Sequence, residues 1–333
     1  MKLQKKSPTG EPIRVAVLPI SGFALMSYAC VVEPLRAANL LARRKLFEIF
    51  HVAPDALVSS SGAAQIACYP DTHIMDSVDL NFVIAGGDPF AFREENTLEW
   101  LRRSARRGAL VGGVSGGPVI LAKAGLMKDR RMTVHWEHAP ELIATYPDAL
   151  VERRLYVIDR DRVTCGGGTA ALDMQHALIA GHYGADLARQ VSDWFLHTDI
   201  RAAAAPQRSG IAERIGHQPA HVIDAVAAME DHMADPLTLT QLALMAGITT
   251  RQLNRLFRDN LGATVMAYYR QLRLNLARDL TTKSAMSVAS IAEVTGFSTT
   301  AHFSNRYREQ FGVRPLEDRR INSRPDPLGS QII

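Results

Sequence analysis

Two segments of the chain carry arginine, asparagine, glutamine and histidine at helical spacing beside a narrow apolar stripe. Side chains of these types recognise base edges in the major groove of DNA, and further arginines hold phosphates. We therefore predict that both segments are helices whose polar faces contact DNA. The predicted contact residues are Thr250, Arg251, Gln252, Asn254, Arg255 and Arg258 in the first segment and Thr300, His302, Asn305, Arg306 and Arg308 in the second.

A different chemistry is possible at Ser115, in the segment Gly-Val-Ser-Gly-Gly. This segment satisfies a loose G-x-S-x-G pattern, in which a sharp turn from strand to helix exposes a nucleophilic serine. Hydrolysis would need a base, and His135 is the nearest candidate, with Glu33 or Asp173 to orient it. The order Ser, Asp or Glu, His of an α/β-hydrolase triad is not evident, because Asp129 is the only carboxylate between Ser115 and His135. A Ser-dependent amidase or hydrolase with a DNA-binding appendage is the alternative to a regulator without catalytic residues.

The polar helices belong to one unit that the sequence contains twice within residues 237–315. In each copy an apolar-faced helix ends at a glycine, Gly247 or Gly296, which suits a turn with positive φ. An apolar pattern over residues 265–280 predicts a single long helix between the copies. This arrangement predicts two helix-turn-helix motifs that enter successive major-groove segments, about 34 Å apart.

The N-terminal part alternates short apolar segments with helical ones. Residues 13–20, 47–53, 80–85 and 109–114 are predicted as strands, the first and third of them buried, and residues 132–135 are predicted to continue the alternation. Strands that alternate with helices form parallel βαβ units in an open, doubly wound sheet. Ligands bind such sheets at the carboxyl ends of the strands.

The predicted ligand site lies at these strand ends. A ligand carboxylate would suit the backbone amides beside Ser115, and a quaternary ammonium would suit an aromatic face such as Trp136 or Phe23. Packing at strand ends and capping of local amides are the alternative roles. The predicted ligand-binding residues are Phe23, Glu33, Asp88, Ser115, Gly116, His135 and Trp136.

Length and charge support two domains with different partners. The 333 residues, 47% of them hydrophobic, are enough for two globular domains. The net charge is only +4, yet residues 251–320 hold 12 Lys and Arg against 6 Asp and Glu, so the rest of the chain is slightly negative. A basic excess confined to the C-terminal part suits a polyanion. A linker rich in Ala, Pro, Ser and Gly separates the predicted domains, giving residues 1–201, 202–219 and 220–333.

Cys30, Cys68 and Cys165 are far apart in the sequence. This spacing argues against a disulfide framework or a zinc site and fits a reducing compartment. No segment has the pattern of a signal peptide or a membrane span. We expect a cytoplasmic protein that uses no metal or cofactor and has no membrane partner.

Residues 220–320 resemble the DNA-binding domain of the AraC/XylS family. The resemblance rests on the repeated unit, on Arg273 and Ala277 of the long helix, and on the closing segment Gly312-Val-Arg-Pro315. It implies double-stranded DNA and RNA polymerase as partners, and a homodimer on a repeated site.

The N-terminal part is similar to the DJ-1/PfpI family, a relative of class I glutamine amidotransferases with a flavodoxin-like doubly wound sheet. The similarity rests on Glu33-Pro-Leu-Arg, Gly113-Val-Ser-Gly-Gly117, Thr133-Val-His-Trp136 and the segment from Thr164 to Asp173. Enzymatic members carry a cysteine at the elbow where this chain has Ser115, which implies that the domain is not an enzyme.

The two domains together resemble GlxA-like transcriptional regulators. The sequence around Glu33, Val134-His-Trp-Glu137 and Gly166-Gly-Gly-Thr is most similar to the sequences of regulators of carnitine, glycine betaine and arginine catabolism. This resemblance implies an activator that responds to a small amine or amino-acid-like metabolite.

Overall fold

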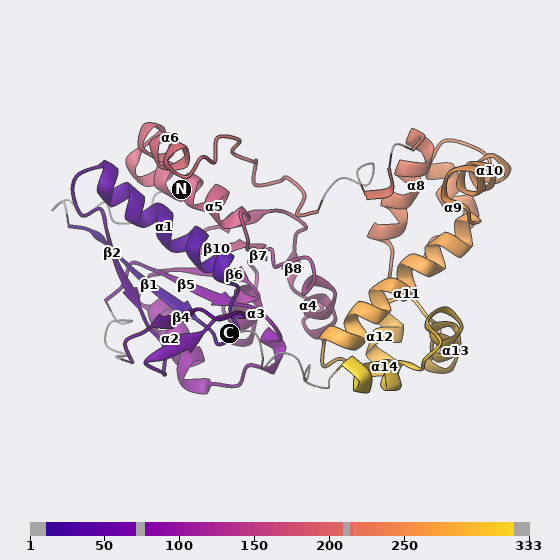
Figure 1. Cartoon of the computed structure of the whole chain (residues 1–333), viewed down its shortest axis with the longest axis horizontal. Helices are drawn as coiled ribbons and strands as arrows, with labels where there is room; N and C mark the ends of the chain where they lie inside the picture. The colour runs from indigo at the N-terminus through magenta and orange to yellow at the C-terminus, as the bar shows by residue number, and fades with distance from the viewer. Residues whose placement is uncertain (1–10, 71–76, 209–213, 217, 323–333) are drawn as a thin grey trace. The chain divides into compact units, whose positions relative to one another are not determined.

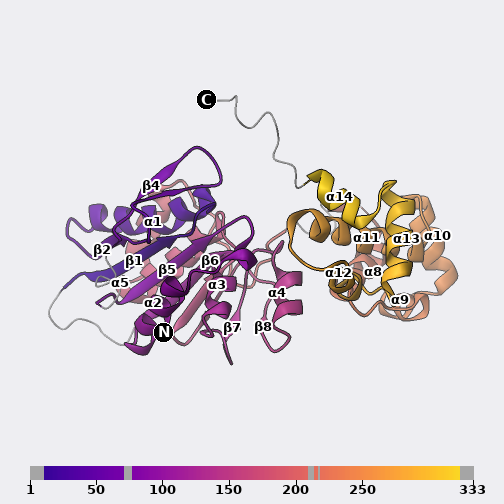
Figure 2. The ribbon, with the colours of Figure 1, turned by 90° about the horizontal axis from the view of Figure 1, so that it is seen from below.

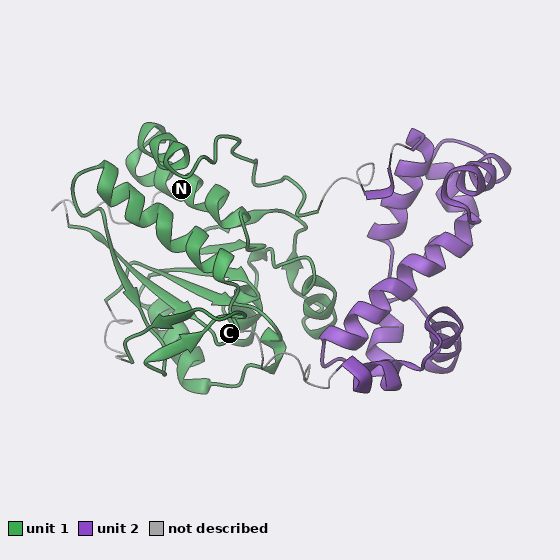
Figure 3. Cartoon of the chain, in the orientation of Figure 1, with its two compact units in different colours: residues 1–208 green, residues 209–333 purple. Residues whose placement is uncertain are grey.

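The computed structural model describes residues 11–70, 77–208, 214–216 and 218–322. The chain divides into two compact units, residues 1–208 and 209–333 (Figure 3). The division falls within the predicted linker, 202–219. Linker residues 209–213 and 217, and the ends of the two predicted domains, 1–10 and 323–333, lie outside the described residues.

Unit 1 is built on a six-stranded sheet in the order β2-β1-β5-β6-β10-β9. Neighbouring strands are parallel except that β9 runs antiparallel to β10. The order reverses beside β1, as in a doubly wound fold, so this predicted fold class is confirmed. The strands are β1 (Ile13–Pro19), β2 (Phe47–His51), β5 (Leu80–Ala85), β6 (Leu110–Ser115), β9 (Tyr156–Asp159) and β10 (Arg162–Cys165).

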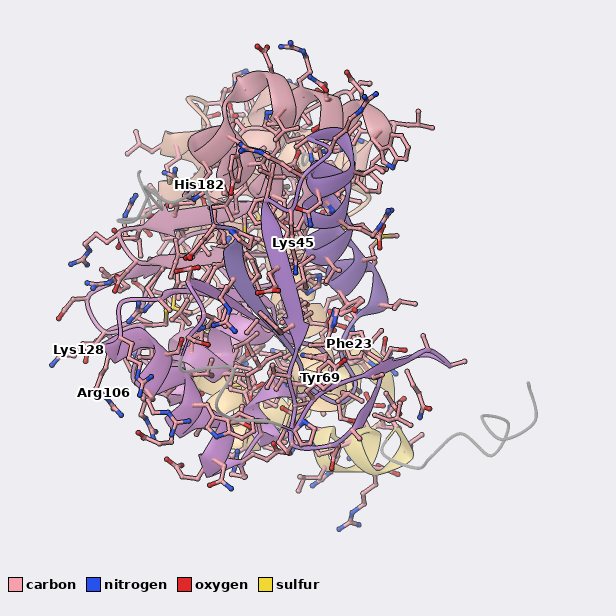
Figure 4. The ribbon with its side chains drawn as sticks, turned by 90° about the vertical axis from the view of Figure 1, so that its left-hand side faces the viewer. Phe23, Lys45, Tyr69, Arg106, Lys128 and His182 are labelled. Atoms are coloured by element: carbon pink, nitrogen blue, oxygen red, sulfur yellow. The ribbon has the colours of Figure 1, made fainter. Side chains whose placement is uncertain are left out.

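Helices cover both faces of this sheet because successive strand side chains point to opposite sides. Val15 and Val17 of β1 enter one apolar core, and Ala16 and Leu18 enter the other. The first core is closed by α1 (Leu25–Leu41), α5 (Ala170–Tyr183) and α6 (Ala185–Trp194), and the second by α2 (Glu95–Arg106), α3 (Gly117–Lys123) and α4 (Ala139–Thr145) (Figures 1 and 2). Figure 4 labels the buried Phe23 together with the exposed Lys45, Arg106 and Lys128.

Short elements flank the main sheet. β3 (Leu57–Ser59) and β4 (Gln65–Ala67) form a hairpin that the sequence analysis did not predict. Residues 132–135 were predicted to continue the main alternation, but β7 (Arg131–Met132) pairs with β8 (Leu150–Val151) in a separate two-stranded sheet. The loop after β7 therefore lies free of ladder pairing and can approach the end of β6. No helix in the described ranges combines the length and apolar character needed to cross a membrane.

Unit 2 is helical, and its long helix α11 (Val265–Lys283) has 19 residues, a length of about 28 Å. Before it, α8 (Ala220–Asp231), α9 (Leu239–Met245) and α10 (Thr250–Leu261) pack around one apolar core with the first half of α11. After it come α12 (Val288–Val294), α13 (Thr300–Phe311) and α14 (Pro315–Asn322). The helix pairs α9–α10 and α12–α13 are the two predicted helix-turn-helix motifs, one on each half of α11.

Candidate DNA-binding surface and effector site

The recognition helices α10 and α13 begin and end in the same way. Each has 12 residues, a threonine N-cap whose side chain accepts the N3 backbone N–H, and a left-handed C-cap glycine. The caps Thr249 and Thr299 therefore correspond, as do Gly262 and Gly312. Pairs of residues at equal distance from these caps occupy equivalent positions on the two helices.

The exposed face of α10 presents Arg251, Arg255 and Arg258. In the part of the chain that the structure describes, the side chains of these arginines form no hydrogen bond or ion pair. The equivalent positions in α13 hold Ala301, Asn305 and Arg308, and the last two are exposed and likewise unengaged among the described residues. Thr300 and His302 are also exposed near the start of α13. Side chains that no intramolecular partner holds are available to bases and phosphates.

Three other predicted DNA contacts have partners inside the protein. Gln252 completes a capping box, with its Oε1 2.8 Å from Thr249 Oγ1. The half-buried Asn254 accepts the backbone N–H of Val265 at 3.2 Å. Arg306 pairs with Glu309 at 2.8 Å and donates to His302 Nε2 at 3.4 Å. Thr250 is half-buried at the start of α10. DNA contacts by Gln252, Asn254 and Arg306 would compete with these intramolecular bonds.

A junction in unit 2 joins the two motifs through the turn of the second. Arg273 of α11 donates to the carbonyls of Thr295 and Gly296, at 2.6 Å each, and stacks over Phe297 at 4.4 Å. A Cβ at Gly296 would lie 2.5 Å from Pro236 Cγ and 2.6 Å from Met233 O. The loop before α9 therefore packs directly on the turn between α12 and α13, which sets the two recognition helices in one fixed relation.

A buried carboxylate holds the end of unit 2. Asp318 of α14 is 2% exposed. It accepts hydrogen bonds from Tyr307 Oη at 2.7 Å, Arg278 Nε at 2.9 Å and Asn322 Nδ2 at 3.0 Å. Together with burial, the hydrogen bond to Asp318 raises the pKa of Tyr307. Arg278 thus positions α13 from within, so part of the basic excess of this region is structural.

In unit 1, Ser115 ends β6 with φ 59° and is 7% exposed. A left-handed backbone at a non-glycine residue is strained and typical of an elbow. The elbow fits because its neighbours lack side chains. A Cβ at Gly117 would lie 2.1 Å from Val83 O, and one at Gly167 would lie 2.6 Å from Ser115 Cβ.

The Gly116 backbone amide at the elbow already has an acceptor. The N–H of Gly116 donates to Ala85 O at 2.9 Å. The fully buried Cys165 lies beside the backbone of Ser115 and Gly167, and burial raises the pKa of its thiol to about 12. The expectation that a ligand carboxylate binds the amides of Ser115 and Gly116 therefore gains no support from this geometry.

His135 approaches the elbow through its backbone, because its N–H donates to Ser115 O at 3.2 Å. The Nδ1 atom of the His135 ring lies 3.4 Å from the backbone nitrogen of Glu137. The His135 ring lies 5.2 Å from that of Trp136 and 5.9 Å from that of His138. Burial, aided by His135, lowers the pKa of His138 to about 4, so this ring is neutral at pH 7. Phe90 packs edge-on to His138.

The remaining predicted ligand residues have contacts of their own. Glu33 forms an ion pair with Arg36 at 2.6 Å, and Asp88 Oδ1 caps the short helix η2 (Pro89–Ala91) through Phe90 N at 3.0 Å. Phe23 is fully buried against Tyr28, 5.5 Å between ring centroids. The structure thus brings the elbow residues Ser115 and Gly116 next to the loop that carries His135 and Trp136. The printed contacts of Glu33, Asp88 and Phe23 are with residues near them in the sequence.

Asp173, considered as an orienter of His135, is fully buried elsewhere. It accepts from His197 Nε2 at 2.9 Å and from Arg201 Nη2 at 2.7 Å. Cys165 and His138 were not predicted at the elbow, although Cys165 lies within the quoted segment from Thr164 to Asp173 and His138 follows Val134-His-Trp-Glu137. Gln207, which accepts the N–H of Trp136 at 2.8 Å, was not predicted either and carries no sequence signal beyond its place in an Ala- and Pro-rich stretch.

Comparison with known proteins connects both units to described families. Residues 14–181 match the DJ-1/PfpI family, and residues 242–321 match a helix-turn-helix domain. The chain is 43% identical over 309 residues to the HTH-type transcriptional regulator GlxA of Rhizobium meliloti, covering 92% of this chain and 95% of the relative. It is 36% identical over 306 residues to the HTH-type transcriptional regulator CdhR of Pseudomonas aeruginosa, covering 91% and 90%.

Solved structures agree on the fold. An AraC family transcriptional regulator from Pseudomonas putida is 24% identical with a TM-score of 0.51, covering 55% of this chain and all of that one. A ThiJ/PfpI family protein from Pseudomonas syringae is 23% identical with a TM-score of 0.51, covering 73% and 94%. The named relatives are transcriptional regulators. The chain therefore belongs to the AraC-type DNA-binding transcriptional regulators that carry an N-terminal DJ-1/PfpI domain.

Proposed function

We propose that this protein is a cytoplasmic transcription activator that responds to a small amine or amino-acid-like metabolite such as carnitine, a betaine or arginine. The observation that carries its DNA-reading role is the set of exposed, unengaged side chains on α10 and α13. Arg251, Arg255 and Arg258 lie on the first helix, and Asn305 and Arg308 on the second. Arginine favours guanine and phosphate, and asparagine favours adenine.

The effector site is proposed at the elbow, around Ser115, Gly116, His135 and Trp136. We infer that Ser115 stands where enzymatic relatives carry a cysteine. A neutral hydroxyl without a hydrogen-bonded base is a poor nucleophile. The half-exposed aromatic ring of Trp136, 39% exposed, offers a face to an organic cation. For these two reasons we propose that the elbow binds a metabolite and does not cleave it.

A homodimer on a repeated operator, in contact with RNA polymerase, completes the proposal. One chain carries two unequal recognition helices and thus reads one asymmetric half-site. A second chain would double the half-site and its binding energy on a repeated operator.

The test combines DNA selection with ligand screening on the full chain. Selection from random duplexes should return an asymmetric motif that occurs twice in each selected site, once for each chain of the homodimer. Carnitine, glycine betaine or L-arginine should raise the melting temperature of the wild type, since a ligand stabilises the state that it binds. Ser115→Trp should abolish that stabilisation while leaving the selected DNA motif unchanged. Equal stabilisation of both proteins would remove the elbow from the effector site, and turnover that is lost in Ser115→Ala would instead support a hydrolase.

A further inference from the structure

Residues 203–208, the last of unit 1, form a strap that is docked on the surface of that unit. The N–H of Leu155 lies 3.1 Å from the carbonyl oxygens of both Ala203 and Ala205. Residue 209, the next along the chain, begins unit 2. Release of this strap therefore adds its residues to the connection between unit 1 and unit 2.

The side chain of Gln207 is the main polar anchor of the strap. Its Oε1 accepts the N–H of Trp136 at 2.8 Å, and its Nε2 lies 2.9 Å from Val134 O and 2.7 Å from Arg154 O. The amide also fills the space over Gly166, where an added Cβ would lie 2.7 Å from Gln207 Cδ. Both polar atoms of the Gln207 amide are hydrogen-bonded, and the amide packs closely on Gly166. The strap is therefore held by a specific contact and not by an incidental surface contact.

Arg208 makes the second contact of the strap. Its guanidinium carbon lies 4.7 Å from the ring centroid of Trp136. This is the cation–π arrangement by which aromatic side chains bind guanidinium and quaternary ammonium groups. Arg208 itself is exposed, and a contact of this kind at an exposed site is weak enough to be displaced.

The segment that receives the strap also reaches the elbow. Trp136 is bound by Gln207 and Arg208, while its neighbour His135 donates its backbone N–H to Ser115 O at 3.2 Å. The strap and the proposed effector site therefore share one short loop. Although Trp136 is 39% exposed, a ligand cannot stack on the face of its ring that Arg208 covers until Arg208 leaves.

We propose that the Trp136 face covered by Arg208 is the cation subsite of the effector, and that a guanidinium or quaternary ammonium ligand binds there by displacing Arg208. This inference rests on the proposed effector function of the elbow. Loss of the Arg208 contact leaves Gln207 as the main anchor and weakens the dock. Release of residues 203–208 adds about 20 Å of extended chain to the connection between the two units. Ligand binding is thereby coupled to the reach of the DNA-binding unit.

The experiment uses the full chain with two cationic probes, glycine betaine and L-arginine, and acetate as an anionic control. Calorimetric titration gives the affinities. Hydrogen exchange at the N–H groups of Trp136 and Leu155, which donate to the strap, is followed by mass spectrometry and reports release of the strap. The variants are Arg208→Ala, Gln207→Ala and Trp136→Ala. Arg44→Ala, which removes an exposed arginine in the turn after α1, is the matched control.

Removal of the competing cation should tighten binding of a cationic probe about two- to fivefold in Arg208→Ala. Arg44→Ala should bind like the wild type, and Trp136→Ala should lose binding. Exchange at these N–H groups should rise when the probe binds the wild type, and should already be high in Gln207→Ala without it. Acetate should change neither readout.

The proposal is overturned if Arg208→Ala binds the probe no more tightly than the wild type, or if these N–H groups exchange equally with and without saturating probe. It also falls if neither cation binds any variant. A melting-temperature rise with a metabolite that carries no positive charge would then leave the proposed effector function standing without the cation subsite. A selected DNA motif without any effector would leave only the DNA-binding function.

Discussion

The helices α10 and α13 bury residues at the same two positions, Leu253 and Phe257 in one and Phe303 and Tyr307 in the other. Their supports differ. The first motif packs on an apolar core with α8 and α11. The second is held by polar contacts as well, because Arg273 bonds its turn and Asp318 bonds Tyr307. The surroundings of a duplicated unit thus decide which of its charges remain for DNA.

The difference gives arginine two roles in unit 2. Arg273, Arg278 and Arg319 donate to backbone carbonyls or to Asp318 inside the unit. Arg251 and Arg255, on the first recognition helix, have no such partner among the described residues. The first motif should therefore contribute more guanine and phosphate contacts, and the second should contribute adenine recognition through Asn305.

The largest difference between the two motifs is expected in the loss of unfolding free energy when their equivalent turn glycines are replaced by alanine. Gly296→Ala should cost about 4 kcal/mol, from a left-handed backbone and from the clash with Pro236 and Met233. Gly247→Ala should cost only about 1 kcal/mol, because φ is also positive but nothing lies within 4 Å of the added Cβ. Calorimetric melting of the full chain measures both, and equal costs would show that the junction yields.

Base recognition should separate the helices next. Arg255→Ala and Asn305→Ala occupy equivalent positions, and each should cost about 1–3 kcal/mol on the selected DNA motif. Each variant should relax preference at its own base pair, guanine for Arg255 and adenine for Asn305. Repeating the selection with each variant reads this out. Loss of preference at one shared position would contradict the assignment of separate half-site segments.

The support of the second motif can be weakened from α11. Arg273→Ala leaves the carbonyls of Thr295 and Gly296 without their donor, at a cost of about 1–2 kcal/mol. Arg270→Ala, an exposed position on the same helix, is the control and should be nearly neutral. Hydrogen exchange should increase in α12 and α13 but not in α10. Uniform loosening of both motifs would show that they unfold as one.

The smallest difference between the two motifs is expected in the DNA affinity lost when a phosphate-contacting arginine is replaced by alanine. Arg258 and Arg308 are equivalent exposed residues, and alanine at either position should weaken binding to all sequences alike. Each loss should flatten the slope of log affinity against log salt by about 1. Fluorescence anisotropy at several salt concentrations measures it. A change in base preference would move that arginine from phosphate contact to readout.

Local patterns made the doubly wound sheet and the repeat predictable. Alternation of apolar segments with helices follows from burial on both sheet faces, and the turn glycines Gly247 and Gly296 follow from their positive φ. The same reasoning could not keep residues 132–135 out of the main sheet, because strand pairing depends on neighbours distant in the chain. It also missed that Gln252 caps its own helix, since capping and base reading favour the same residue type.

The sequence by itself determined the family, the two recognition helices and the elbow at Ser115, because these depend on residue type and spacing along the chain. Tertiary structure decided which side chains remain available. It engaged Asn254, Arg273 and Asp318 within unit 2, and it committed the Gly116 amide at the elbow to Ala85. It also docked Gln207 on the loop at Trp136. Each polar group forms only a few hydrogen bonds, and only the folded chain shows which of them are already made within the protein.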